Sequence, residues 1–256
     1  MIRSRICLTI TVLVFIFLYV PIILLMVNSF NDSKYATVWT GFTLKWYTAL
    51  FSEPDLWEAF INSMIIGISS TVTSLIIGSL AAFTVFRYRS RLQSLHFGLI
   101  YAPLILPDIL LGISLLMLFV VWNVKLGLFT IYIAHTTFCI SYVTMLMISK
   151  LQHFDLTLVE AAHDLGAGTY QTFKKVVLPL ITPGLIAAAL LSFTLSIDDF
   201  VITFFVAGEG ATTLPLYIYS MIKYGSTPVI NALSTLILLA TFLLVIVYHT
   251  FAEEER

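Results

Sequence analysis

Long stretches of apolar residues dominate the chain and recur six times along it. Each is long enough for a helix that crosses the hydrocarbon core of a bilayer, which is roughly 30 Å thick and needs about 20 helical residues. We therefore predict an all-α membrane protein with six transmembrane helices. We place them at residues 6–29, 61–86, 96–121, 127–149, 181–206 and 230–251.

Composition supports a membrane protein and excludes several other classes. Of the 256 residues, 59% are hydrophobic and only 11% are charged, with a mean hydropathy of +1.00, so the apolar excess must face lipid. The formal net charge of −1 argues against nucleic acid as a partner. Cys7 and Cys139 lie in apolar segments without metal-ligand spacing, which makes a disulfide framework or a zinc site unexpected.

The first apolar run begins behind two basic residues, as a secretory signal would. It continues from Ile6 to about Met26, however, without a small-residue cleavage site. Because this is too long for the apolar region of a signal peptide, we expect a retained first span.

The basic residues predict the orientation of the chain in a bacterial inner membrane. With both termini in the cytoplasm, nine of the 13 Lys and Arg residues fall on the inner side, and three of them lie in the short segment 87–91. An excess of Lys and Arg in inner loops is the usual orientation signal. The nine are Arg3, Arg5, Arg87, Arg89, Arg91, Lys150, Lys174, Lys175 and Arg256.

These spans divide the chain into four parts. They are an N-terminal transmembrane helix (1–30), a periplasmic loop (31–60), a five-helix core (61–251) that contains an inner loop at 150–180, and a cytoplasmic tail (252–256). A further outer connection, about 207–229, contains an apolar segment at 214–222 that is typical of an interfacial or re-entrant helix.

The inner loop has the clearest local signals for helix ends. Thr157 followed by Glu160 three residues later is a capping box, which predicts a short helix from residue 158. Gly166 supplies a left-handed stop, and Thr169 can cap a second short helix that runs toward Pro179. The loop should therefore form a helix–turn–helix with a shallow face of small side chains.

Three acidic residues lie inside predicted spans. Asp108 follows Pro103 and Pro107 in the third span, and Asp198 and Asp199 lie in the fifth. An ionised carboxylate at the centre of a transmembrane helix costs roughly 2.5–3.5 kcal/mol on insertion scales, so such groups usually face protein or water. No Lys or Arg lies at matching depth, which suggests that a cationic cargo brings the neutralising charge. The alternative is that the acids are protonated or hydrogen-bonded contacts between helices.

Helical spacing places one of these acids on a polar stripe. Ser192, Ser196, Asp199 and Thr203 follow one another at i, i+4, i+7 and i+11 and would share one face of the fifth span. We therefore expect Asp199 and Ser196 to line the pathway. Asp198, turned about 100° away, would either bind the cargo from the edge of this face or contact a neighbouring helix.

Two other polar or aromatic sites are ambiguous. His135 lies among apolar residues and threonines, and such a histidine is more often a satisfied interior group than a ligand, so we leave it out of the site. Trp46 and Tyr47 are typical of the aromatic belt at a membrane interface. The face of Trp46 could also bind a cation at an outer vestibule, and we keep it as a candidate pathway residue.

The inner loop resembles the EAA signature of bacterial ABC-importer permeases. The match consists of Glu160-Ala161-Ala162, then Gly166, then Val176 where isoleucine is usual, then Leu178-Pro179. The resemblance implies that the loop is the coupling helix that fits a cleft on an ATPase subunit. It also implies that Glu160, Ala161, Ala162 and Gly166 contact that ATPase.

Within this family the chain is similar to the PotC-type permeases of spermidine/putrescine importers. The similarity is carried by segments at 19–31, 42–47, 106–116, 192–201 and 214–225. It implies the type I (MetI-like) importer fold and a heterodimer with a PotB-type permease. It further implies two ABC ATPase subunits and a periplasmic polyamine-binding protein as partners.

The energy source is expected to reside in another chain. GxxxxGK[ST] is absent, so we expect no cofactor here and assign ATP and magnesium to the partner ATPase. HExxH and GxSxG are also absent, which argues against an enzyme. Two alternatives stay open: a permease for another cationic or metal cargo, and a stand-alone secondary transporter. Paired broken helices would favour the second, and only the Pro103–Pro107 region predicts such a break.

Overall fold

The computed structural model describes residues 2–34, 38–88, 92–152, 154–225 and 228–254. Within these residues the regular structure is helical, apart from one isolated bridge between Asn31 and Phe42. The all-α prediction is therefore confirmed. The chain forms two compact units, the first made of Met1–Trp57 with Ile218–Arg256 and the second of Glu58–Tyr217.

The first unit is built around two long helices that pack along each other. Its elements are α1 (Ile2–Asn28), α2 (Lys45–Phe51) and α12 (Pro228–Glu254). α12 packs against both α1 and α2. None of the most apolar part of α1 is buried inside the chain, as expected of a helix surrounded by lipid.

The connection after α1 is organised by one buried side chain, Asn31. Its Nδ2 donates to the carbonyl of Val38 at 2.9 Å, and its Oδ1 accepts the N–H groups of Ser33 and Thr40 at 3.2 and 3.1 Å. Because Asn31 is 1% exposed, these bonds replace the water that its amide loses on burial.

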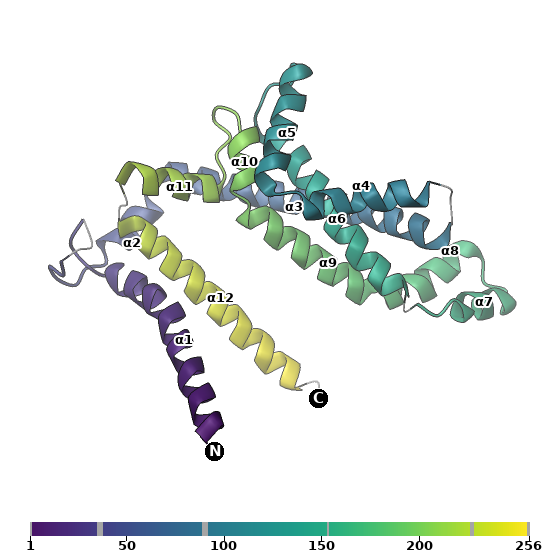
Figure 1. Ribbon diagram of the computed structural model, residues 1–256, viewed down its shortest axis with the longest axis horizontal. Coiled ribbons are helices and arrows are strands. Elements are labelled where there is room, and N and C mark those ends of the chain that lie inside the picture. Colours follow the sequence, from purple (N-terminus) through teal and green to yellow (C-terminus); the bar gives the residue numbers. More distant parts are fainter. Residues whose placement is uncertain (1, 35–37, 89–91, 153, 226–227, 255–256) are drawn as a thin grey trace. The chain divides into compact units, whose positions relative to one another are not determined.

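The second unit is a helical bundle with α6 at its centre. In Figure 1, α4 and α9 run beside α6, and α5 and α10 lie together at one end of this bundle. More than half of the most apolar part of α6 is buried (56%), against 33% in α3, and α6 contributes buried residues to both core clusters. The helices are α3 (Pro54–Arg87), α4 (Gln93–Ile105), α5 (Asp108–Val121), α6 (Leu128–Gln152), α9 (Leu178–Asp198) and α10 (Val201–Val206).

Four helices in the described residues are long and apolar enough to cross a membrane, and five if a bent pair counts as one span. The predicted third span, 96–121, is that pair: α4 and α5 meet at an angle of 111°. The single straight helix expected there is therefore wrong. Pro107 lacks an N–H and forces the preceding residue into extended conformation, and the backbone at Leu106 has ψ 136°. The predicted sixth span coincides with α12, whose described apolar stretch is shorter, Pro228–Leu243.

The predicted fifth span, 181–206, also differs from one continuous helix. α9 ends at Asp198, and α10 begins at Val201 after an extended residue, Asp199 (φ −68°, ψ 121°). No glycine or proline marks this break. The structure therefore contains a second broken span that the sequence pattern does not predict.

At its other end, the fifth span joins the inner loop without interruption. α8 (Thr169–Thr172), a π-helical segment (Phe173–Val177) and α9 form one run of helix. The separate second helix ending near Pro179 is therefore wrong. A proline ring clashes with the carbonyl four residues earlier, and a π turn just before Pro179 widens the helix at that point.

The apolar segment at 214–222 forms a helix, α11 (Leu214–Gly225). Two hydrogen bonds tie the start of α11 to α3. Asn62 Nδ2 donates to the carbonyl of Thr212 at 3.0 Å, and the N–H of Leu214 donates to Ser63 Oγ at 2.8 Å. These side chains satisfy backbone groups at the beginning of the helix.

The close approach of α5 and α10 depends on Gly112. A Cβ there would lie 2.8 Å from Cδ2 of Phe205 and 3.3 Å from the Cα of Ile202. We expect Gly112→Ala to lower the free energy of unfolding by roughly 1–3 kcal/mol through overpacking. Gly98→Ala is the matched control, because a Cβ at Gly98 meets no atom within 4 Å. Midpoints of thermal unfolding should separate the two variants, and equal midpoints would contradict this account of the packing.

Candidate functional site

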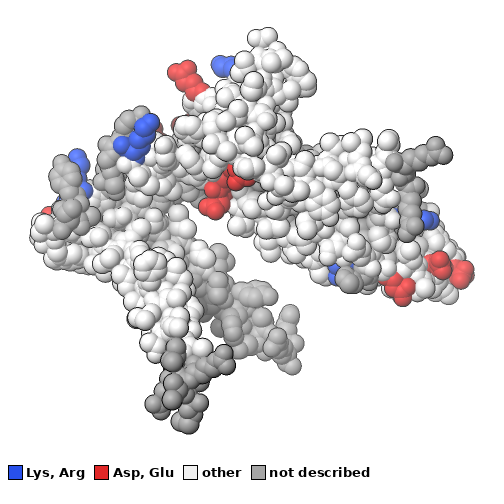
Figure 2. Space-filling view, viewed as in Figure 1, with Lys and Arg blue, Asp and Glu red and all other residues white. Residues whose placement is uncertain are grey.

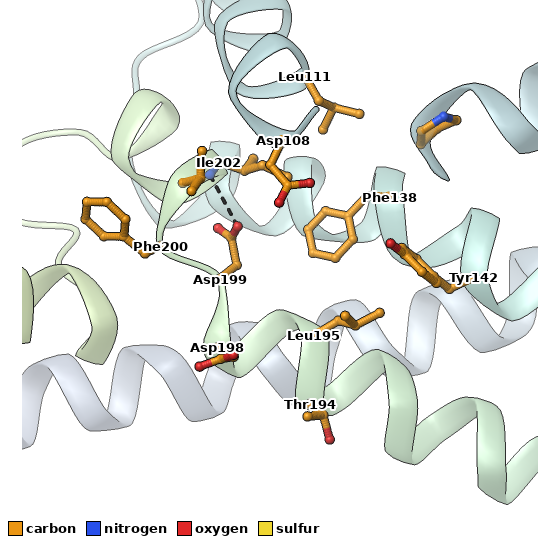
Figure 3. A pocket seen from close by; sticks show the side chains of 12 residues that line it. Asp108, Leu111, Phe138, Tyr142, Thr194, Leu195, Asp198, Asp199, Phe200 and Ile202 are labelled. Carbon is orange, nitrogen blue, oxygen red and sulfur yellow. Dashed lines mark hydrogen bonds between the residues drawn. The ribbon is translucent and has the colours of Figure 1, made fainter. Parts of the chain in front are cut away.

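A pocket of about 270 Å³ opens in the second unit where its two broken spans come together (Figure 3). All three acids predicted inside the membrane contribute to it, together with aromatic and apolar side chains. The lining residues are Pro103, Asp108, Leu111, Phe138, Tyr142, Thr194, Leu195, Asp198, Asp199, Phe200, Val201 and Ile202.

Asp199 lies in the gap between α9 and α10 and binds the first turn of α10. Its Oδ2 accepts the N–H and the Oγ1–H of Thr203, both at 2.8 Å. Its Oδ1 accepts the N–H of Ile202 at 3.2 Å (Figure 3). Its side chain is only 8% exposed. This carboxylate therefore satisfies backbone groups that the break leaves without helical partners.

His135 on α6 completes this arrangement, and its interpretation as a satisfied interior group is confirmed. Its Nε2 lies 3.2 Å from Asp199 Oδ2 and 2.9 Å from Thr203 Oγ1. Its Nδ1 lies 2.7 Å from Ser196 Oγ, and the residue is 1% exposed. The pairing with Asp199 is the feature that the sequence analysis missed, because histidine can pair with an acid inside a bundle as Lys and Arg do.

Ser196 lies beneath the pocket and is not among the residues that line it. It is 4% exposed, and its Oγ contacts His135 and, at 3.1 Å, Ser70 Oγ on α3. The predicted polar stripe assumed a continuous helix through Asp199, so it does not form. Ser196 and Thr203 are instead joined through the two nitrogens of His135.

Asp108 and Asp198 are the open carboxylates of the pocket. Both residues are exposed, and neither takes part in a hydrogen bond or an ion pair with the described part of the chain. Asp108 is the first residue of α5, where the positive end of the helix dipole favours a negative charge. Asp198 is the last residue of α9, where the dipole disfavours one. In Figure 3 the Asp198 side chain is turned away from that of Asp199.

The pocket combines these carboxylates with the aromatic rings of Phe138, Tyr142 and Phe200. Carboxylates accept charge-assisted hydrogen bonds from ammonium groups, and aromatic faces attract the same cations. Figure 2 shows that most of the described surface in this view is uncharged, so a group of acids at the helix breaks is exceptional. The site is suited to binding an organic cation.

Trp46 lies in the first unit, on α2. Its indole N–H donates to the carbonyl of Asn31 at 2.7 Å, and the Lys45 ammonium lies 4.6 Å from the centre of its ring. Lys45 also pairs with Asp32. The cation-binding face expected of Trp46 therefore holds a cation of the chain itself.

The inner loop forms α7 (Thr157–Asp164), but the predicted capping box is absent from it. Thr157 is the first helical residue, and both its N–H and its hydroxyl donate to Asp155 Oδ1, at 2.9 and 2.8 Å. These two bonds hold the pKa of the Asp155 carboxyl below its usual range. An ionised Asp155 then lies where the dipole of α7 favours negative charge.

α7 ends just before Gly166, as the sequence predicts. Gly166 has φ +81°. Its N–H donates to the carbonyl of His163 at 2.8 Å, and the N–H of Ala167 donates to the carbonyl of Ala162 at 3.0 Å. This pair of bonds is the Schellman motif. α7 buries none of its residues, and Leu165 is 89% exposed, so the loop presents an apolar face that no other described part of the chain covers.

The hydroxyl of Thr203 can be tested apart from its methyl group. Thr203→Val keeps the shape of the side chain but removes its hydrogen bond to Asp199. We expect the free energy of unfolding to fall by roughly 1.5–3 kcal/mol, which is typical of a hydrogen bond to a charged group. Thr182→Val is the control, because the Thr182 hydroxyl bonds only the carbonyl of Leu178 in its own helix and is exposed. A lower melting midpoint is expected for the Thr203 variant alone. Equal midpoints would show that the bond adds nothing.

Comparison with known proteins agrees with this architecture. The chain is 41% identical over 238 residues to the spermidine/putrescine transport system permease protein PotC of Escherichia coli K12, covering 93% of this chain and 90% of that protein. It is 40% identical over 263 residues to the putrescine transport system permease protein PotI of the same strain, covering 100% and 94%.

Solved structures show the same fold at low sequence identity. A bacterial ABC transporter involved in the import of the acidic polysaccharide alginate superposes with a TM-score of 0.71 at 18% identity, over 98% of this chain and 96% of that chain. The MetNI methionine ABC transporter gives 0.57 at 20% identity, over 82% and 95%. The expected type I (MetI-like) permease fold is thereby confirmed.

The family model described as binding-protein-dependent transport system inner membrane component matches residues 74–253. This range contains the inner loop and every residue of the pocket. The chain is therefore a multi-pass membrane protein that belongs to the family of binding-protein-dependent transport system inner membrane components.

Proposed function

We propose that this chain is the permease subunit of an ATP-driven ABC importer for polyamines, and that it forms half of the translocation pathway. The observation that carries the proposal is the pair of open carboxylates, Asp108 and Asp198, beside aromatic rings in a membrane-spanning unit. The names of the two relatives, which specify spermidine and putrescine, point to the same class of cargo.

The chemistry of the pocket fits a flexible polycation. An ammonium group can pair with each open carboxylate, and the methylene segments between ammonium groups can lie against Phe138 and Leu195. A carboxylate without a partner inside a membrane-spanning unit is costly, and a cargo with several positive charges can compensate more than one such carboxylate. Anionic or neutral cargo would leave both carboxylates uncompensated.

The exposed α7 provides the coupling surface in this proposal. Glu160, Ala161, Ala162 and Gly166 would contact an ABC ATPase subunit. The two alanines and the glycine allow close approach, and no other described part of the chain covers the apolar face of α7. ATP and magnesium would then be bound by two partner ATPases. A PotB-type permease and a periplasmic polyamine-binding protein would complete the importer, with both termini of this chain in the cytoplasm.

A stand-alone secondary transporter is the second candidate, because two broken spans meet at the pocket. Broken helices that surround a central site are a feature of such transporters. The exposed hairpin at 157–172 favours the ABC importer. Transport by the purified chain alone, driven by an ion gradient, would establish the alternative.

The cargo assignment predicts the effect of removing one open charge at a time. Asp108→Asn and Asp198→Asn should each reduce uptake of labelled putrescine and spermidine at least about tenfold, since one lost charge-assisted contact is worth about 1.4 kcal/mol or more. Cells that carry the complete transport system should be used, with the amount of assembled complex measured. Glu209→Gln, an exposed acid outside the pocket, is the control. Normal uptake in both Asp variants would refute the pathway assignment.

The coupling role predicts a contrast between two neighbouring glycines. Ala at position 166 would have to adopt φ +81°, at a cost of roughly 1–2 kcal/mol for an L-residue in the left-handed region. Gly166→Ala should therefore reduce recovery of the ATPase subunits with the permease and lower cargo-stimulated ATP hydrolysis.

Gly168→Ala is the matched control for this experiment. Gly168 has φ −71°, which any residue adopts, and a Cβ there meets no atom within 4 Å. Equal ATPase recovery and hydrolysis in the two variants would remove the coupling assignment.

A further inference from the structure

One buried network joins the pocket to the core of the second unit. It runs from α3 through Ser70 to Ser196 on α9, then to His135 on α6, and ends at Asp199 and Thr203 on either side of the second break. Ser70, His135 and Thr203 are each at most 1% exposed. The network is therefore shielded from bulk solvent, and its hydrogens can be assigned from the contacts that its members make with one another and with the backbone.

The hydrogens can be assigned from the Ser70 end. Ser70 Oγ lies 2.7 Å from the carbonyl of Ile66, which only accepts, so the Ser70 hydroxyl donates there. Ser196 must then donate to Ser70, because the Ser70 hydrogen is already used. With the Ser196 hydrogen also used, its contact with His135 requires a donor at Nδ1.

The Asp199 end requires a second hydrogen on the same ring. Asp199 accepts from two N–H groups and from the Thr203 hydroxyl, which is the pattern of an ionised carboxylate. Because the Thr203 hydrogen is used on Asp199, both oxygens near Nε2 of His135 are acceptors. Nε2 must therefore donate as well, and a ring with hydrogen on both nitrogens is an imidazolium.

We propose that His135 is a positioning residue that acts as a built-in counter-cation. As an imidazolium it neutralises Asp199 and fixes its carboxylate at the break, so that only Asp108 and Asp198 present uncompensated charge to the cargo. Three carboxylates and one imidazolium leave two net negative charges in and beneath the pocket. The identity of the cargo in this inference rests on the proposed function, whereas the charge of His135 rests on the hydrogen-bond network alone.

The arrangement defines how many positive charges the pocket accepts. A cargo with two ammonium groups, such as putrescine, balances the two open carboxylates. Without the imidazolium, Asp199 would add a third negative charge and favour a cargo with three positive charges, such as spermidine. His135 would thus set the preference between polyamines without touching them.

The variants follow from the positions of the ring nitrogens. His135→Gln places an amide N–H near the position of Nε2, so it keeps a donor for Asp199 but removes the charge. The double variant with Asp199→Asn replaces the ion pair with two neutral amides. Replacing both members of a buried ion pair is often tolerated, whereas removing one is strongly destabilising.

The first measurement concerns charge and does not depend on cargo. The assembled importer, labelled with ¹⁵N-histidine and reconstituted in lipid bilayers, is analysed by solid-state NMR, and the signal lost in His135→Gln identifies the ring. Two protonated nitrogens at that signal are expected. One protonated and one bare nitrogen would overturn the proposal whether or not the protein carries polyamines.

The second measurement concerns selectivity in the same importer. The ratio of the KM for putrescine to that for spermidine should rise about tenfold in His135→Gln, because one added charge near the pocket acts on cargoes that differ by one charge. It should return toward the original ratio in the double variant, with a higher melting midpoint than in the single variant. An unchanged ratio in His135→Gln, or a double variant no better than the single one, would show that His135 serves only as a structural contact. Absence of uptake of both polyamines by the unaltered importer would instead refute the proposed function.

Discussion

The structure depends on one constraint: in a membrane, a backbone group that leaves its helix must find its partner within the protein. The second break of the second unit meets this constraint with an acidic side chain. Asp199 binds the N–H groups at the start of α10, and Asp108 occupies the first position of α5. The carboxylate that supports this break also places a negative charge beside the pocket.

The buried network shows how such a charge is tolerated. His135, Ser196 and Thr203 surround Asp199 from α6, α9 and α10, so a group that would be costly alone is held by several short contacts. Asp108 and Asp198 have no such support in the described residues. This contrast separates a carboxylate that serves the fold from carboxylates that are free to serve a cargo. Proximity in the sequence does not separate them, since Asp198 and Asp199 are neighbours.

Much of the architecture could be predicted from the sequence because its signals are local. Apolar length identifies the long helices, Pro107 marks the first break, and Gly166 ends α7. The second break has no comparable signal, since Asp198-Asp199-Phe200 contains neither glycine nor proline. The Asp199 carboxylate that supports it is held by His135, about 60 positions earlier in the chain, and helical spacing does not reveal a contact of this kind. The polar stripe through Ser196 and Thr203 failed for the same reason, because it assumed that the helix continues.

The π turn at Phe173–Val177 determines the angle about the helix axis between the side chains of α8, in the exposed hairpin, and those of α9, at the pocket. A π turn holds one residue more than an α turn, and one residue corresponds to about 100° around a helix axis. The side chains of α8 and those of α9 therefore point in directions that an unbroken α-helix would not allow. Shortening this turn by one residue would keep the helix intact. It would nevertheless rotate the hairpin away from any partner that binds it in its present orientation. The rotation of the hairpin relative to the pocket about this helix axis thus depends on a single inserted residue.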